Sequence, residues 1–153
     1  MSKKIWLLFV VCCLALYFLY QSTLYNTSAD GQNLSIKTVC TVKNLDPNGT
    51  CQVTAVTTVI AKKDTAYGWK CCQTPETAQN ITGANNTSRW LGAGCNYGDG
   101  NSYPITIGES KEFVSSDDSL LSPTNRFTVV DVEVADGREV LTTHQKVNLA
   151  IAS

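Results

Sequence analysis

The chain begins with a short basic segment, and a long apolar run follows it. Lys3 and Lys4 precede residues 5–20, which contain no charged side chain. A helix over this run is about 24 Å long at 1.5 Å per residue, and the residues after it can extend it toward the ~30 Å of a hydrocarbon core. Aromatic residues stand near both ends, where membrane proteins place them at the headgroups: Trp6, Tyr17, Tyr20 and Tyr25. The pattern predicts an N-terminal transmembrane anchor within residues 1–25.

The distribution of charge predicts the orientation of this helix. No Lys or Arg follows until Lys37, which keeps Lys3 and Lys4 in the cytoplasm and exports the rest of the chain. A cleaved signal peptide is the alternative, but it needs small residues soon after the apolar run, and Tyr20 and Gln21 fit that position poorly. We expect a retained signal-anchor in a single-pass membrane protein. Its C-terminal domain is then extracytoplasmic, which means periplasmic, extracellular or part of a virion.

Beyond residue 33 the apolar positions alternate with period two, which is typical of strands. The alternation covers residues 34–43, and residues 51–62 are rich in Val, Thr and Ile. Between them, Asp46-Pro47-Asn48-Gly49 is a strong turn signal, because Pro presets φ and Gly accepts a positive φ. We predict a hairpin in which Cys40 lies opposite residue 55 or 56 and Cys51 lies opposite residue 44 or 45.

Further short strands are expected over residues 67–72, 103–107, 109–115 and 126–135. Asp136-Gly137 is typical of a two-residue hairpin turn. A returning strand then begins at Val140, and the alternation of Val147, Leu149 and Ile151 carries it to the end of the chain. The expected fold is all-β: an immunoglobulin-like β-sandwich of about seven short strands in residues 34–153, joined to the anchor by a linker over residues 26–33.

Composition and charge narrow the class of partner. The net charge is −1 and charged residues make up 16% of the chain. Because no basic patch stands out, we expect no nucleic-acid partner. The partners expected instead are membrane lipid, contacted by residues 5–20, and other proteins.

Cysteines are dense beyond the apolar run, at Cys40, Cys51, Cys71, Cys72 and Cys95. In a small exported domain this density predicts disulfide bonds. The hairpin separates Cys40 and Cys51 by several residues at ~3.3 Å each, too far for a bond between them, so each is expected to reach one of the other three. In a strand, Cys71 and Cys72 point to opposite faces and should have separate partners. The odd number leaves a thiol that is either buried and inert or linked to another subunit.

The acceptor motif for N-glycosylation occurs six times, at Asn26, Asn33, Asn48, Asn80, Asn85 and Asn86. In a host that glycosylates exported proteins, several of these sites should carry glycans. A chain rich in Asn, Thr and Ser also produces the motif by chance, and both interpretations stay open.

No group of residues predicts catalysis, metal binding or a cofactor. His144 is the single histidine and there is no Cys-x-x-Cys, so disulfides explain the cysteines better than zinc does. The glycine-rich residues 92–100 lack the Lys-Ser/Thr pair of a phosphate loop. Asp99 and the pair Asp117-Asp118 offer too few ligands for calcium. We expect a protein that is not an enzyme.

Two functions are therefore considered. The first is a structural or interaction subunit of a surface assembly, either a cell envelope or a virus particle, with the terminal strand over residues 147–151 as a candidate edge for strand addition. The alternative is a membrane-anchored or secreted adhesin or receptor-like binding module. Its candidate contact aromatics are Trp69, Trp90, Tyr97 and Tyr103.

Overall fold

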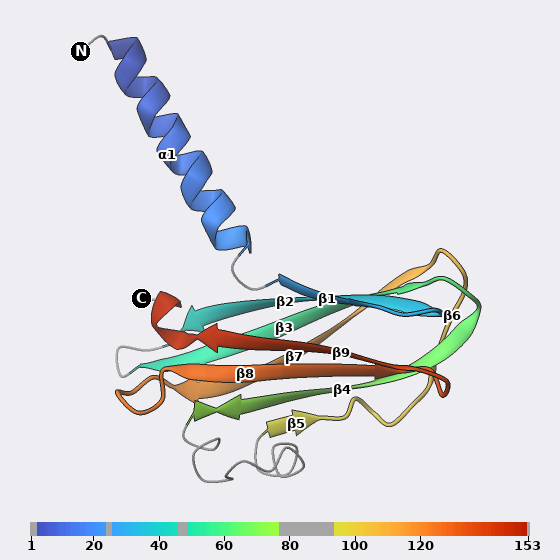
Figure 1. The fold of residues 1–153 in the computed structure, drawn as a ribbon. Helices are drawn as coiled ribbons and strands as arrows, with labels where there is room; N and C mark the ends of the chain where they lie inside the picture. The colour runs from blue at the N-terminus through green and yellow to red at the C-terminus, as the bar shows by residue number, and fades with distance from the viewer. Residues whose placement is uncertain (1–2, 24–25, 46–48, 77–93, 153) are drawn as a thin grey trace.

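The computed structural model describes residues 3–23, 26–45, 49–76 and 94–152. A helix, α1 (Lys3–Thr23), precedes a domain built almost entirely of strands. The strands form two antiparallel sheets whose inner faces enclose the core (Figure 1). The domain is a β-sandwich, as the alternating pattern predicts.

The helix α1 exposes its apolar side chains in this structure. Side chains are described for residues 3–16 of the helix, where Val10 is half-buried. The other large apolar side chains are 52–71% exposed: Ile5, Trp6, Leu7, Leu8, Phe9, Val11, Leu14 and Leu16. Figure 1 shows the helix pointing away from the sandwich. Within the described residues, no helix is both long enough and apolar enough to cross a membrane.

The first sheet has the order β1-β2-β3-β7. Its strands are β1 (Asn26–Asp30), β2 (Leu34–Asn44), β3 (Thr50–Ala61) and β7 (Ser110–Leu120). The hairpin of β2 and β3 confirms the strongest sequence prediction, because Cys40 pairs with Ala55 and Cys51 pairs with Asn44. The turn chemistry and the alternation therefore set the register correctly.

The second sheet has the order β5-β4-β8-β9, and β6 also pairs with β4. Its strands are β4 (Thr65–Pro75), β5 (Gly94–Asn96), β6 (Tyr103–Ile105), β8 (Phe127–Ala135) and β9 (Val140–Asn148). Each expected strand is present, although β4 and β7 are longer than predicted. The short β5 lies outside the ranges in which we predicted strands.

Apolar residues that alternate along the strands meet between the two sheets. The fully buried members include Leu34, Val53, Val59, Val130, Val132, Val134 and Val147. Each such side chain contributes about 1.5–3 kcal/mol when it is removed from water. Polar contacts also join the sheets: Thr38 Oγ1 lies 2.8 Å from Thr143 Oγ1, and Gln73 Nε2 donates to the Val53 carbonyl at 3.0 Å.

The β8–β9 connection is longer than predicted. Ala135 pairs with Val140, so the loop has residues 136–139 and the prediction of a two-residue turn is wrong. The Asp136 carboxylate accepts hydrogen bonds from the backbone N–H groups of Arg138 and Glu139, each at 2.9 Å. An aspartate that bonds to its own loop in this way stabilises a wider turn.

Both ends of the domain also differ from prediction. Residues 26–33 were expected to be a linker, but β1 lies within them and pairs with residues 35–39. At the other end, β9 stops at Asn148 and a 3₁₀ helix, η2 (Leu149–Ala152), follows. Leu149 is fully buried and its N–H donates to the Arg126 carbonyl at 2.9 Å. Because this contact turns the chain over the core, the strand expected to reach Ile151 ends at Asn148, and residues 149–151 do not form the predicted edge for strand addition.

Candidate functional site

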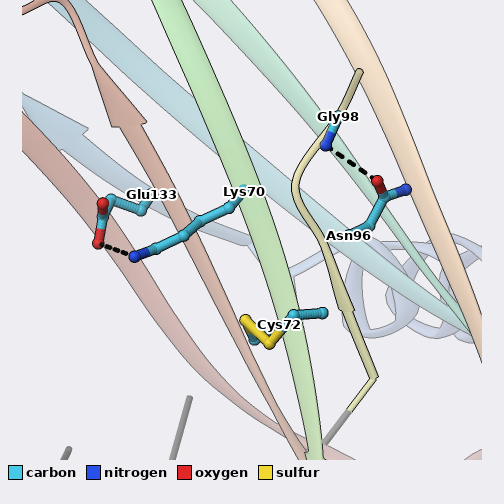
Figure 2. Close-up of a disulfide and its surroundings, with 6 residues drawn as sticks. Lys70, Cys72, Asn96, Gly98 and Glu133 are labelled. Carbon is cyan, nitrogen blue, oxygen red and sulfur yellow. Dashed lines mark hydrogen bonds and ion pairs between the residues drawn. A yellow bond between two sulfur atoms is a disulfide. The ribbon is translucent and has the colours of Figure 1, made fainter. Parts of the chain in front are cut away.

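The outer face of the second sheet carries a disulfide bond. Cys72 of β4 and Cys95 of β5 face each other in the strand pairing and are bonded, with their Cα atoms 4.1 Å apart (Figure 2). The prediction of a disulfide in this domain is confirmed. Cys71, the neighbour of Cys72, points into the core, as the alternation of a strand requires.

Cys40, Cys51 and Cys71 form no disulfide bond, so the prediction that Cys40 and Cys51 each join another cysteine is wrong. All three are buried on the inner faces of the sheets. Burial, and secondarily the nearby Cys71, raises the pKa of Cys40 to about 12. Burial also raises the pKa of Cys71 to about 11, against the effect of a hydrogen bond with Ser115. These two thiols stay protonated near neutral pH and are therefore poor nucleophiles.

Strand pairing places the disulfide in one row with two further side chains on the outer face of the sheet. Cys72 pairs with Asp131 of β8, and Asp131 pairs with His144 of β9. The Asp131 carboxylate is buried and its Oδ1 lies 2.5 Å from His144 Nδ1, whereas the His144 side chain is 53% exposed. The carboxylate orients the imidazole, which presents its other edge to solvent. The sequence marks His144 only as the single histidine and gives no sign of this contact.

An ion pair lies in the next row of the same face. Lys70 Nζ of β4 is 3.2 Å from Glu133 Oε2 of β8, and both side chains are about one quarter exposed (Figure 2). A shallow hollow of about 180 Å³ adjoins this pair, between Trp69 and Ala135. Typical small-molecule sites enclose about 300–1,000 Å³, so this hollow is smaller than such a site.

The candidate contact aromatics do not form one exposed platform. The Trp69 ring stacks on Phe113 of β7, with centroids 4.2 Å apart and an angle of 10° between the planes. Tyr103 packs against Tyr67 at 5.6 Å. Tyr97 is exposed, and Trp90 lies outside the described residues. The two inward contacts support packing rather than recognition for Trp69 and Tyr103.

The glycosylation candidates fall into three groups. Asn26 is exposed at the start of β1. Asn33 is buried, and its Nδ2 donates to Asp136 Oδ2 at 2.8 Å, so a glycan on this nitrogen does not fit the folded domain. The others lie outside the described residues: Asn48, Asn80, Asn85 and Asn86.

A carboxylate that the sequence did not mark as important joins the β8–β9 loop to the turn between β1 and β2. Glu139, in the β8–β9 loop, accepts hydrogen bonds from the backbone N–H groups of Gln32, Asn33 and Leu34 at 2.8, 2.7 and 3.1 Å. These bonds, the one from Asn33 first, lower the pKa of Glu139. No sequence signal pairs a loop glutamate with a turn about one hundred residues away.

Among the described residues, no three His, Cys, Asp or Glu side chains converge to hold a metal ion. The thiols of Cys40 and Cys71 face the core, away from the outer row of Asp131 and His144. The outer face of the second sheet is polar at Lys70, Asp131, Glu133 and His144.

No protein-family model and no curated protein matches the chain. Among solved structures, similarity extends to the X-ray structure of Northeast Structural Genomics Consortium target SoR45, with 10% identity and a TM-score of 0.47 over 79% of this chain and 88% of that one. A calcium-binding mutant of Bacteroides uniformis β-glucuronidase 2 matches with 12% identity and a TM-score of 0.44 over 76% of this chain, which is 13% of that protein. The solution structure of R. palustris CsgH matches with 13% identity and a TM-score of 0.36 over 77% of this chain and 96% of that one. At this level of similarity, none of the three bears on what this chain does.

Proposed function

We propose that this protein is a non-enzymatic, single-pass membrane protein whose extracytoplasmic β-sandwich is a structural or interaction subunit of a surface assembly. The assembly is a cell envelope or a virus particle. Membrane lipid surrounds residues 5–20, with Lys3 and Lys4 on the cytoplasmic side, and other proteins contact the sandwich.

The exposure of the α1 side chains carries this proposal. Eight large apolar side chains of one helix are more than half exposed, and the sandwich does not cover them. Moving eight such side chains out of water is worth roughly 10–25 kcal/mol. A soluble domain does not leave so much apolar surface in water, because such a surface causes aggregation. Two lysines followed by an uncharged apolar run are typical of a helix that is inserted in lipid.

The disulfide supports an extracytoplasmic location. Cys72–Cys95 is a bond that forms and persists in oxidising compartments. The strand order supports the immunoglobulin-like description: β2, β3 and β7 match the first-sheet strands A, B and E, and β4, β8 and β9 match C, F and G. Sandwiches of this kind occur in many cell-surface proteins, which agrees with an interaction role.

The polar outer face of the second sheet is the proposed contact surface. It presents His144, Lys146 and the Lys70–Glu133 pair on three neighbouring strands. The Lys146 ammonium also lies 4.1 Å from the centre of the Phe127 ring. Oriented charges on a rigid sheet provide specificity in protein contacts more than they provide affinity.

Membrane extraction of the full chain tests the anchor. The wild-type protein should stay in the membrane pellet after an alkaline wash and leave it only with detergent. The Val11→Lys/Leu14→Lys variant adds two charges near the centre of the apolar run, each costing about 2.5–3.5 kcal/mol on insertion scales, and should leave the pellet. The matched control, Ile107→Lys/Val140→Lys, adds two charges at exposed apolar positions of the sandwich and should stay. Release of the wild-type chain by the alkaline wash would refute the anchor.

Two further measurements test the location and the role. A protease added outside intact cells or particles should digest the sandwich, and mass spectrometry without reductant should find Cys72 bonded to Cys95. Extracted in mild detergent, the protein should migrate on native gels well above its own 16.6 kDa. Recovery only as a monomer, after subtraction of the detergent mass, would remove the assembly role and leave the anchor standing.

A further inference from the structure

The strand β7 is a long open edge of the first sheet. It is the last strand in the order β1-β2-β3-β7, and in the described part of the chain it pairs only with β3. Eleven consecutive residue pairs join the two strands, from Ser110 to Leu120, without a skipped position. The ladder therefore has no bulge to twist the edge away, and its outward N–H and C=O groups can accept another strand.

The other edges of the two sheets are shorter or covered. The edge strands β1 and β5 have 5 and 3 residues. The edge strand β9 has 9 residues, and β1 lies against it. By comparison, β7 has 11 residues with neither Pro nor Gly among them. It also carries Val114, which is 54% exposed on the outer face of the sheet.

Two charges of opposite sign lie at equal distances from Val114 along β7, with Glu112 and Asp118 as the other charged residues of the strand. Lys111 lies three residues before it, and Asp117 lies three residues after it. The Lys111 ammonium contacts the Pro104 carbonyl and lies 3.7 Å from Glu109 Oε1. An ammonium has three donors, so Lys111 can also bind a further carboxylate. One oxygen of Asp117 accepts the Asp118 N–H at 2.9 Å, which leaves its second oxygen for an outside donor.

We propose that β7 of one molecule pairs antiparallel with β7 of a second copy, around a two-fold axis at Val114. Val114 then faces Val114 of the second copy, and Lys111 faces Asp117 of the other molecule twice. Directly opposed residues of an antiparallel pair lie on the same face, so each Lys111–Asp117 pair is correctly placed. The two first sheets become one continuous sheet.

The charges select this register over its neighbours. If the axis moves by one residue to Phe113, Glu109 faces Asp117 of the second copy. If it moves to Ser115, Glu112 faces Asp118. Like charges directly opposite each other destabilise a sheet. The register centred on Val114 places Lys111 opposite Asp117 twice. Along β7, it places no like charges directly opposite each other.

This inference does not depend on the membrane anchor, because it uses only contacts of the sandwich. It does give the proposed assembly a specific element: a two-fold contact between copies, on a sheet other than the one with the polar face. A homodimer needs a self-complementary patch, and the order of charges along β7 meets that requirement.

Cysteine cross-linking of the full chain tests the register. In a Cys12→Ser/Cys13→Ser background, which removes the exposed thiols of α1, Val114→Cys places two thiols at opposed positions about 4.5–5.5 Å apart between Cβ atoms. Diamide, a two-electron oxidant, takes up both thiol protons and two electrons, so a disulfide-linked dimer should form. Ser116→Cys and Ser110→Cys are matched controls, because their thiols would be about 13 Å and 26 Å from their own copies. They should stay monomeric on non-reducing gels.

Charge reversal gives an independent test that does not rely on new cysteines. Lys111→Asp and Asp117→Lys should each weaken the dimer, by about 2- to 30-fold in Kd, because exposed ion pairs contribute modestly and each occurs twice. The double variant Lys111→Asp/Asp117→Lys should restore the wild-type Kd, measured by analytical ultracentrifugation in detergent. A purely structural effect of either single variant would not be reversed by the second.

Two results would overturn the pairing. One is a Val114→Cys chain that stays monomeric under diamide while its Cys72–Cys95 bond and its strand content by circular dichroism are intact. The other is cross-linking that is equal for Val114→Cys and Ser116→Cys. If the chain remains in the membrane and in its assembly but β7 does not self-pair, this inference fails and the proposed function stands.

Discussion

Thr38 holds the two sheets together through a buried cluster of three hydroxyls. Its Oγ1 lies 3.0 Å from Thr57 Oγ1 on the neighbouring strand and 2.8 Å from Thr143 Oγ1 on the opposite sheet. All three residues are at most 3% exposed. Thr38 is thus the shared partner of the other two hydroxyls, and its replacement by Val removes both contacts without changing the shape of the side chain.

The expected loss of stability follows from the two hydroxyls that Thr38→Val deprives of their shared partner. The hydroxyls of Thr57 and Thr143 stay buried without that partner, at a cost of about 1–3 kcal/mol each. We therefore expect a loss of roughly 2–6 kcal/mol in the free energy of unfolding. This is a large share of the 5–15 kcal/mol that a domain usually has. Thr57→Val or Thr143→Val should cost only about 1 kcal/mol, because Thr38 keeps one partner.

The triple variant Thr38→Val/Thr57→Val/Thr143→Val makes the prediction specific. Replacing every member of a polar cluster by apolar groups of similar shape can be nearly neutral, so the triple variant should be more stable than Thr38→Val alone. Urea unfolding of the full chain in detergent, followed by tryptophan fluorescence, measures this order. Thr41→Val, at an exposed position of the same strand, is the control and should change little. A triple variant less stable than Thr38→Val would refute the reasoning.

Three further predictions use the same unfolding measurement. Cys72→Ala/Cys95→Ala removes a disulfide with a sequence separation of 23 and should lower the free energy of unfolding by about 3 kcal/mol. Reductant should not destabilise this variant further. If reductant still destabilises the variant, other cysteines are responsible for that loss. The pKa of Glu139 is lowered by its backbone hydrogen bonds, so its contribution is present above the unfolded-state pKa near 4.5 and is lost as pH falls through the lower folded pKa. Glu139→Gln should therefore flatten the acid side of the stability profile, and an unchanged profile would contradict the assignment. Gly31→Ala should destabilise the domain, because the new Cβ would lie 2.6 Å from Glu139 Oε1. Gly68→Ala should destabilise it less, because the atom nearest to its new Cβ is 3.9 Å away.

The sequence by itself determined the local features whose physical cause is local. The β2–β3 hairpin was predicted with its register because the alternation of apolar residues and the Pro-Asn-Gly turn act over neighbouring positions. The strand that contains Asp131 and Glu133 was recognisable for the same reason. Alternation places these two carboxylates on the outer face, but it does not say what lies across from them.

Only the tertiary structure decided which distant residues meet. Cys72 bonds to Cys95 because β4 and β5 pair, whereas Cys40 and Cys51 lie in the core and form no disulfide bond. Glu139 holds the turn at Gln32 across about one hundred residues. Strand propensity and turn chemistry depend on a few adjacent residues, whereas these contacts depend on how the two sheets are ordered and stacked. The order and stacking of the sheets depend on the whole domain, so only the tertiary structure shows them.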